Sequence, residues 1–240
     1  MSARFQVLDW RPTPMGTISL RRRWDPTVGE DVYEVKLDSE FLMSSLFTVV
    51  EVEMARLALA DAAGEDMDVA VGGLGLGYTA RTVLENLDVR SLVVVEALGE
   101  VIEWHQDGLV PVGEELATDP RCKLVRGDFF GMVGSEDGLD PEAPARTFDA
   151  VIVDIDHSPR HVLHPSHAAF YEPAGLRSIA RHLNPGGVFA LWSNDPPDSD
   201  FTKVLEGEFA RARAEQVTFH NPLQERSAAN TVYLATTPVA

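Results

Sequence analysis

The feature that most constrains this chain is a short apolar run that ends in a glycine-rich turn. The segment 69–77 reads VAVGGLGLG, a strand-like run followed by three alternating glycines, Gly73, Gly75 and Gly77. Glycine lets the backbone approach a ligand closely, and a helix that begins after the turn presents free N–H groups. Glu96 ends the next apolar run, where a carboxylate can accept both hydroxyls of a ribose. The pattern predicts the nucleoside-binding half of an α/β fold.

The glycine spacing narrows the choice of ligand. A dinucleotide-binding turn needs glycines at its first, third and sixth positions. Counted from Gly73, the sixth position is Tyr78. An NAD-dependent oxidoreductase is therefore disfavoured, while a tight turn without any ligand stays an alternative.

Composition limits the environment and the partners. The chain has 240 residues, a formal net charge of −18 and one cysteine, Cys122. Such a charge repels nucleic acid and anionic membrane surfaces and attracts cations, although it also serves solubility. No apolar run is long enough to cross a membrane, and no signal pattern begins the chain. We expect a cytoplasmic protein with a small, cationic substrate, and no nucleic-acid or membrane partner.

The order of the elements predicts the architecture. Residues 1–45 alternate like short strands and suggest a small antiparallel β unit, and residues 46–62 have helical periodicity. Strands and helices then alternate over residues 68–213, which is typical of a doubly wound parallel sheet. We expect strands at 68–72, 91–96, 122–126, 149–154 and 187–192, helices at 77–87, 99–107, 168–182 and 201–213, a surface loop at 134–146 and a C-terminal antiparallel pair. Residues 46–240 would then form one Rossmann-like domain.

Several polar residues follow the expected strands. Gly127, Asp128 and Phe129 come after the third strand, Asp154 to Pro159 after the fourth, and Ser193 to Asp195 after the fifth. Ligands of open α/β sheets bind at this carboxyl edge. Their convergence predicts one site there.

These motifs resemble the spermidine synthase-like branch of the class I S-adenosylmethionine (SAM)-dependent methyltransferase fold. The resemblance covers roughly residues 15–195 and includes the glycine turn, Glu96, Gly127-Asp128, the VIVD run at 151–154, FYE at 170–172 and PGGVF at 185–189. It implies a mostly parallel seven-stranded sheet. It also implies that Glu96 holds the ribose hydroxyls, that Asp128 binds the adenine amino group and that Asp154 lies beside a reacting amine. Dimers are common in this family, so we expect a homodimer.

The sequence departs from this family at three places. Aminopropyl-transferring members carry an aspartate where Gly75 stands, and a D-S-x-D-P motif where this chain reads Asp154-Ile-Asp156-His157-Ser-Pro. Their tyrosine-glutamine pair before the first helix is also absent, near Glu51. The missing acids favour a methyltransferase that uses SAM on a small, amine-like acceptor. The alternatives are an aminopropyltransferase that uses decarboxylated SAM and a non-catalytic nucleoside-binding scaffold.

A few side chains are candidates for removing a proton from the acceptor. They are Asp154, Asp156 and His157, of which histidine has a suitable ordinary pKa. Four histidines between His157 and His167 have a spacing that resembles metal ligation. Pro159 and Pro165 interrupt that segment, however, so one helical face cannot present all four. We therefore expect no metal site.

Overall fold

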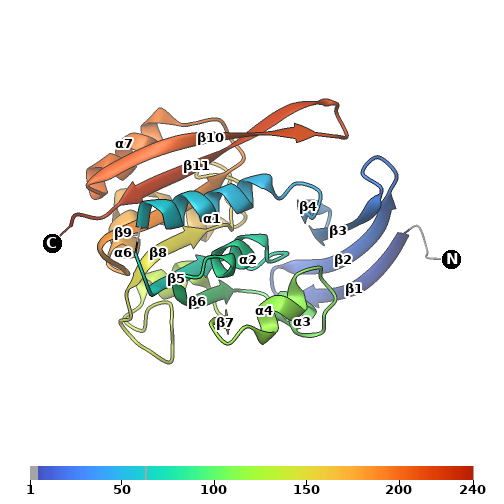
Figure 1. Cartoon of the computed structure of the whole chain (residues 1–240), viewed down its shortest axis with the longest axis horizontal. Coiled ribbons are helices and arrows are strands. Elements are labelled where there is room, and N and C mark those ends of the chain that lie inside the picture. The colour runs from blue at the N-terminus through green and yellow to red at the C-terminus, as the bar shows by residue number, and fades with distance from the viewer. Residues whose placement is uncertain (1–4, 63, 240) are drawn as a thin grey trace.

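The computed structural model describes residues 5–62 and 64–239 and contains two sheets (Figure 1). The first is an antiparallel sheet in the order β1-β2-β3-β4, formed by Phe5–Thr13, Gly16–Asp25, Glu30–Leu37 and Glu40–Ser44. Their alternating apolar residues give each strand one face that can be buried. Part of the expected N-terminal unit, residues 1–4, lies outside the described residues.

The second sheet has seven strands in the order β10-β11-β9-β8-β5-β6-β7. Five of them are parallel: β5 (Met67–Gly72), β6 (Val89–Glu96), β7 (Cys122–Arg126), β8 (Phe148–Val153) and β9 (Leu183–Ser193). The hairpin of β10 (Arg211–Asn221) and β11 (Arg226–Thr236) joins β9 in antiparallel register. The expected fold class is confirmed.

Helices cover both faces of the large sheet. One hydrophobic core joins it to residues of α1 (Val49–Ala62), α2 (Tyr78–Glu85), α3 (Gly99–Gln106) and α4 (Gly113–Thr118). The other core contains residues of α5 (Phe129–Gly134), α6 (Pro173–Ala180) and α7 (Ser199–Glu208). Alternate residues of one strand divide between them, with Val69 and Val71 in the first core and Ala70 in the second. This arrangement explains why the parallel strands are apolar throughout.

The antiparallel sheet is packed into the first of these cores. Ile18, Leu20 and Val35 are at most 1% exposed and belong to the same cluster as Met54 of α1 and Leu74 of the glycine turn. The small sheet is therefore held against the α/β part by shared apolar burial. That contact brings β3 and β4 beside the glycine turn, where the cavities described below lie.

Two expected helices differ from the structure, and one expected surface loop is held more firmly than predicted. The helix expected at 201–213 ends at Glu208, because Arg211–Arg213 pair with Leu234–Thr236 in the terminal hairpin. The helix expected at 168–182 is a 3-10 turn, Pro165–Tyr171, followed by α6 from Pro173. The expected surface loop at 134–146 is anchored inward, since Leu139 and Asp140 are buried and Asp140 accepts hydrogen bonds from Lys123 and Arg146.

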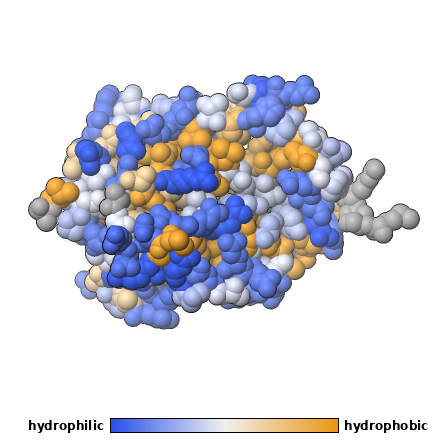
Figure 2. Space-filling model, viewed as in Figure 1, coloured by the Kyte–Doolittle hydropathy of each residue, from blue (hydrophilic) through white to orange (hydrophobic). Residues whose placement is uncertain are grey.

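The hydrophilic character of the surface is consistent with the highly charged composition of the chain. Hydrophilic residues predominate on the face shown in Figure 2, and the apolar ones form separate patches. Over the described residues, no helix combines the length and apolar character that a membrane crossing requires.

Candidate functional site: two cavities that meet at Asp154

Two cavities open beside the carboxyl ends of the parallel strands. The Glu96 cavity has a volume of about 370 Å³ and is lined by Glu96, Asp128, Phe129 and apolar residues of the small sheet. The Glu51 cavity has a volume of about 340 Å³ and is lined by Glu51, Trp192, Asn194 and Asn230. Both volumes suit small-molecule ligands. Met43, Gly75 and Asp154 line both cavities, which therefore form one continuous site.

The glycine turn shapes the junction between the two cavities. Gly73, Gly75 and Gly77 all have positive φ angles, between 51° and 93°, which favour glycine. A Cβ on Gly73 would lie 2.2 Å from the carbonyl oxygen of Asp154, and one on Gly77 would lie 2.6 Å from Val112 and Leu116. These two glycines are thus required for close packing of the turn. Gly75 lines the cavities, and a Cβ at this position would lie 2.8 Å from the sulfur of Met43.

Glu96 lies at the end of β6 and is fixed by the turn. Its Oε2 accepts the Leu74 N–H at 3.0 Å and its Oε1 accepts the Leu98 N–H at 2.8 Å. Burial raises the pKa of Glu96, and these backbone hydrogen bonds oppose the rise. A carboxylate can accept several hydrogen bonds, so Glu96 is also a suitable acceptor for ligand hydroxyls.

Asp128 and Phe129 complete the wall of the Glu96 cavity. Asp128 caps α5, where its Oδ1 accepts the Phe130 N–H at 3.1 Å. Phe129 is buried and packs against Gly72. Gly127 donates its N–H to the Glu96 carbonyl oxygen at 2.9 Å and so joins the ends of β6 and β7. The structure therefore brings Glu96 and Asp128 to one cavity, as the strand order predicts.

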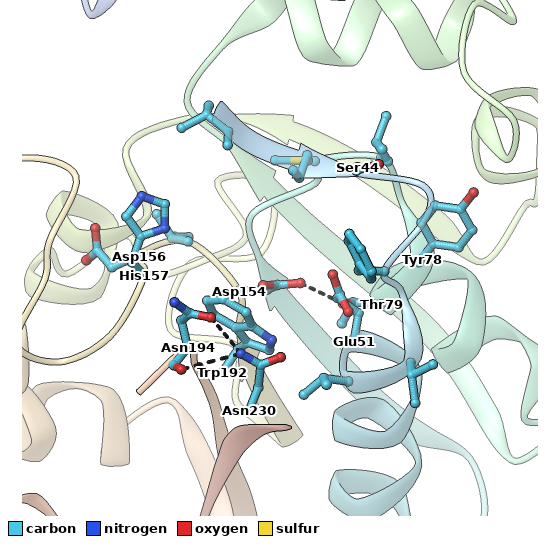
Figure 3. A pocket seen from close by; sticks show the side chains of 18 of the residues that line it. Ser44, Glu51, Tyr78, Thr79, Asp154, Asp156, His157, Trp192, Asn194 and Asn230 are labelled. Carbon is cyan, nitrogen blue, oxygen red and sulfur yellow. Dashed lines mark hydrogen bonds between the residues drawn. The ribbon is translucent and has the colours of Figure 1, made fainter. Parts of the chain in front are cut away.

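Asp154 and Glu51 face the same cavity from different elements (Figure 3). Asp154 follows β8, and its Oδ2 accepts a hydrogen bond from Thr79 Oγ1 at 2.8 Å. Burial raises the pKa of Asp154 to about 6, although the Thr79 hydrogen bond lowers it. Burial raises the pKa of Glu51 to about 8, and the neighbouring Asp154 charge adds to the rise. Two carboxyl groups this close disfavour simultaneous ionisation, so the pair attracts a cation or retains a proton.

Asp156 and His157 have different surroundings. Asp156 is 2% exposed and accepts hydrogen bonds from Tyr171 Oη, His167 Nδ1 and the Leu163 N–H, at 2.7 to 2.9 Å. His157 lies at the wall of the Glu51 cavity, and its Nε2 is 2.9 Å from Glu40 Oε1 on β4. The carboxyl group of Asp156 is therefore engaged in holding the loop, whereas His157 links that loop to the small sheet.

The other histidines of this segment do not converge. His161 contacts Ser158 and Asp195, and His164 contacts Ser166. Within residues 5–62 and 64–239, no group of three or more His, Cys, Asp or Glu side chains is arranged to hold a metal ion.

Sequence reasoning missed several residues of the Glu51 cavity, above all Glu51 itself. A signal for Glu51 was present, because Met54, Ala55 and Ala58 follow it at helical spacing and all three are buried. An acidic residue on a buried helix stripe is costly unless it has a role. Asn230 carried no such signal, since it comes from β11, far from the strand-end motifs.

Known proteins are similar to this chain in sequence. No protein-family model matches the chain. A polyamine aminopropyltransferase of Pseudomonas aeruginosa is 28% identical over 216 residues, which are 82% of this chain and 56% of the relative. One of Prochlorococcus marinus is 30% identical over 139 residues, 58% of this chain and 44% of the relative. The chain thus spans about half the length of these curated relatives.

Solved structures share the fold. Spermidine synthase from Thermotoga maritima aligns with a TM-score of 0.72 at 18% identity, covering 98% of this chain and 74% of that one. A spermidine synthase in complex with the transition-state analogue AdoDATO aligns with a TM-score of 0.74 at 17% identity, covering 98% and 75%. The sequence relatives are aminopropyltransferases, which supports the alternative given in the sequence analysis over methyl transfer. The chain is therefore similar in sequence to polyamine aminopropyltransferases and shares the Rossmann-like fold of the solved spermidine synthases.

Proposed function

We propose that this protein transfers an aminopropyl group from decarboxylated SAM to a small amine. The observation that carries the proposal is the charge of the two cavities. Among the described residues, no lysine or arginine lines either of them, whereas Glu51, Glu96, Asp128, Asp154 and Asp156 do. The carboxylate of SAM would find no side-chain cation there, and burying it among acids is costly. Decarboxylated SAM lacks that carboxylate and keeps its ammonium group.

The Glu96 cavity fits the adenosine part of such a donor. Glu96 is a suitable acceptor for the ribose hydroxyls, and Asp128 Oδ2 can accept the adenine amino group. The apolar side chains of Ile18, Val35 and Leu37 from the small sheet would cover the ring and the sulfur. Gly73 and Gly75 leave the backbone open where the donor passes toward Asp154.

The junction then supplies the chemistry. The acceptor nitrogen attacks the aminopropyl methylene carbon that is bonded to the sulfonium. The bond between that carbon and the sulfur breaks, and methylthioadenosine leaves as a neutral thioether. The proton lost by the nitrogen passes to a carboxylate, for which Asp154 is the candidate because it lines both cavities. The enzyme contributes alignment and proton removal, since the sulfonium already activates the carbon.

The test compares the two donors directly. The purified chain is incubated with an amine panel and either decarboxylated SAM or SAM, and the nucleoside product is identified by mass spectrometry. We expect methylthioadenosine from decarboxylated SAM, formed only when an amine is present. S-adenosylhomocysteine from SAM would overturn the proposal in favour of methyl transfer. No product from either donor, together with binding of methylthioadenosine, would favour a non-catalytic scaffold.

We also propose a cytoplasmic homodimer that uses β1 as part of its interface. Phe5, Val7 and Trp10 are 48–62% exposed and pair with alternate residues of β2, so they share one face of the small sheet. Apolar side chains on one exposed sheet face favour contact with a second copy. Light scattering on the purified chain measures its mass, and a Trp10→Glu variant should shift a dimer toward monomer.

A further inference from the structure

Acidic groups are unevenly distributed in the Glu51 cavity. Glu51 and Asp154 face each other where this cavity meets the Glu96 cavity. The third acid of the lining, Asp156, already accepts three hydrogen bonds and is buried. Within residues 5–62 and 64–239, the carboxylates free to bind an ammonium group therefore lie at one end of the cavity.

The other end of the cavity carries neutral hydrogen-bonding groups. Asn230 Nδ2 donates to Asn194 Oδ1 at 2.7 Å, which orients both amides. The indole Nε1 of Trp192 is buried and has no hydrogen-bond partner among the described residues. In the view of Figure 3, these three side chains are grouped on the opposite side of Asp154 from Glu51. A buried donor without a partner is costly, so this end is suited to a ligand that brings an acceptor.

We propose, on the basis of the proposed function, that the acceptor is a primary amine whose far end is a neutral amide or hydroxyl group, and that it is not a diamine. The amine end would lie between Glu51 and Asp154, together with the ammonium group of the donor. The far end would meet Asn194, Asn230 and Trp192. A second ammonium group at that end would gain no carboxylate partner among the lining residues that the structure describes, whereas a neutral polar group can exchange hydrogen bonds with the amides.

The first test compares acceptors of one length. The full chain is assayed with decarboxylated SAM and a four-carbon diamine, the corresponding amino alcohol, the amino amide and the amino acid, and methylthioadenosine release gives kcat/KM for each. We expect the amino amide or amino alcohol to exceed the diamine by about tenfold, because an unpaired buried charge is costlier than an unpaired neutral group. Preference for the diamine or the amino acid would overturn this inference and leave aminopropyl transfer intact. No turnover with any amine would instead overturn the proposed function, and with it this inference.

A charge-adding variant gives the second test. Asn194→Asp keeps the oxygen that accepts from Asn230 and places a carboxylate at the neutral end. Its kcat/KM for the diamine, relative to the amino alcohol, should rise about tenfold, because hydrogen bonds to charged groups are the stronger ones. Gln224→Glu is the matched control. It adds the same charge at the exposed turn between β10 and β11, where its oxygen already accepts from Arg226.

The two variants separate a local effect from a general one. An altered preference in Asn194→Asp together with an unaltered one in Gln224→Glu supports the assignment of the neutral end. An unaltered preference in Asn194→Asp, or the same change in both variants, would overturn it.

Discussion

The two cavities of the site are built from different kinds of sequence information. The Glu96 cavity takes its carboxyl groups from the ends of three parallel strands, β6, β7 and β8. The Glu51 cavity adds Glu51, Trp192, Asn194 and Asn230, from α1, the end of β9 and β11, which the fold brings together from distant parts of the chain. The first arrangement is inherent in the topology of an open α/β sheet. The second depends on individual side chains, so under the proposed function the acceptor can change while the donor site is kept.

Asp154 belongs to both cavities, so its substitution tests whether they act as one site. We expect Asp154→Asn to lower kcat by about 10²–10⁴, the usual contribution of a positioned proton acceptor. Affinity for methylthioadenosine, measured by calorimetry, should stay within about threefold, since Glu96 and Asp128 are unchanged. Loss of nucleoside binding with retained turnover would contradict this role.

In the Glu96 cavity, the substitution of an acid should change the affinity for the nucleoside. Asp128→Ala removes a carboxylate and should weaken methylthioadenosine binding by about 1.5–3 kcal/mol, the typical contribution of a hydrogen bond to a charged group. Because Asp128 also caps α5, Asp128→Asn serves as a control that retains the cap and removes the charge. Unchanged affinity in both variants would exclude the adenine assignment.

In the Glu51 cavity, the substitution of an acid should change the stability of the fold. Folding raises the pKa of Glu51 from 4.5 to about 8, so the native state binds this proton more tightly than the unfolded chain does. The stability that goes with the bound proton is present below pH 4.5 and is lost as the pH rises through about 8. Glu51→Gln removes this loss. Its free energy of unfolding should exceed that of the unaltered chain by about 1 kcal/mol or more near pH 9, since a change of one in a pKa corresponds to about 1.4 kcal/mol.

Urea denaturation at several pH values measures this difference. Glu53→Gln on the same helix is the control, because Glu53 pairs with Arg56 at the surface. A pH-independent effect of Glu51→Gln, or an equal effect of the control, would show that ionisation of Glu51 does not destabilise the folded state.

The difference between the cavities also explains what the sequence could predict. Strand-end residues such as Glu96 and Asp128 were expected at one site because parallel strands align their carboxyl ends. Asp156 follows the same strand as Asp154, yet its carboxyl group accepts hydrogen bonds from Tyr171 and His167. Only the tertiary packing reveals these contacts. Similarly, Arg211 continues a helical pattern but pairs with Thr236 in the hairpin. Local pattern predicts where a residue lies along an element, and long-range packing decides what its side chain is free to do.

The smallest effect should come from the residue that joins the glycine-turn helix to Asp154. Thr79→Val removes the hydroxyl that donates to Asp154 Oδ2, and because that bond lowers the pKa of Asp154, the acid limb of the kcat profile should move to higher pH. One hydrogen bond contributes about 0.5–1.5 kcal/mol, so kcat near neutral pH should fall by about two- to tenfold. Thr82→Val is the matched control, since its hydroxyl donates to the Tyr78 carbonyl oxygen within α2 and does not contact the acid. If both variants moved the pH profile equally, the cause would be the helix, and Thr79 would have no part in setting the proton affinity at the junction of the two cavities.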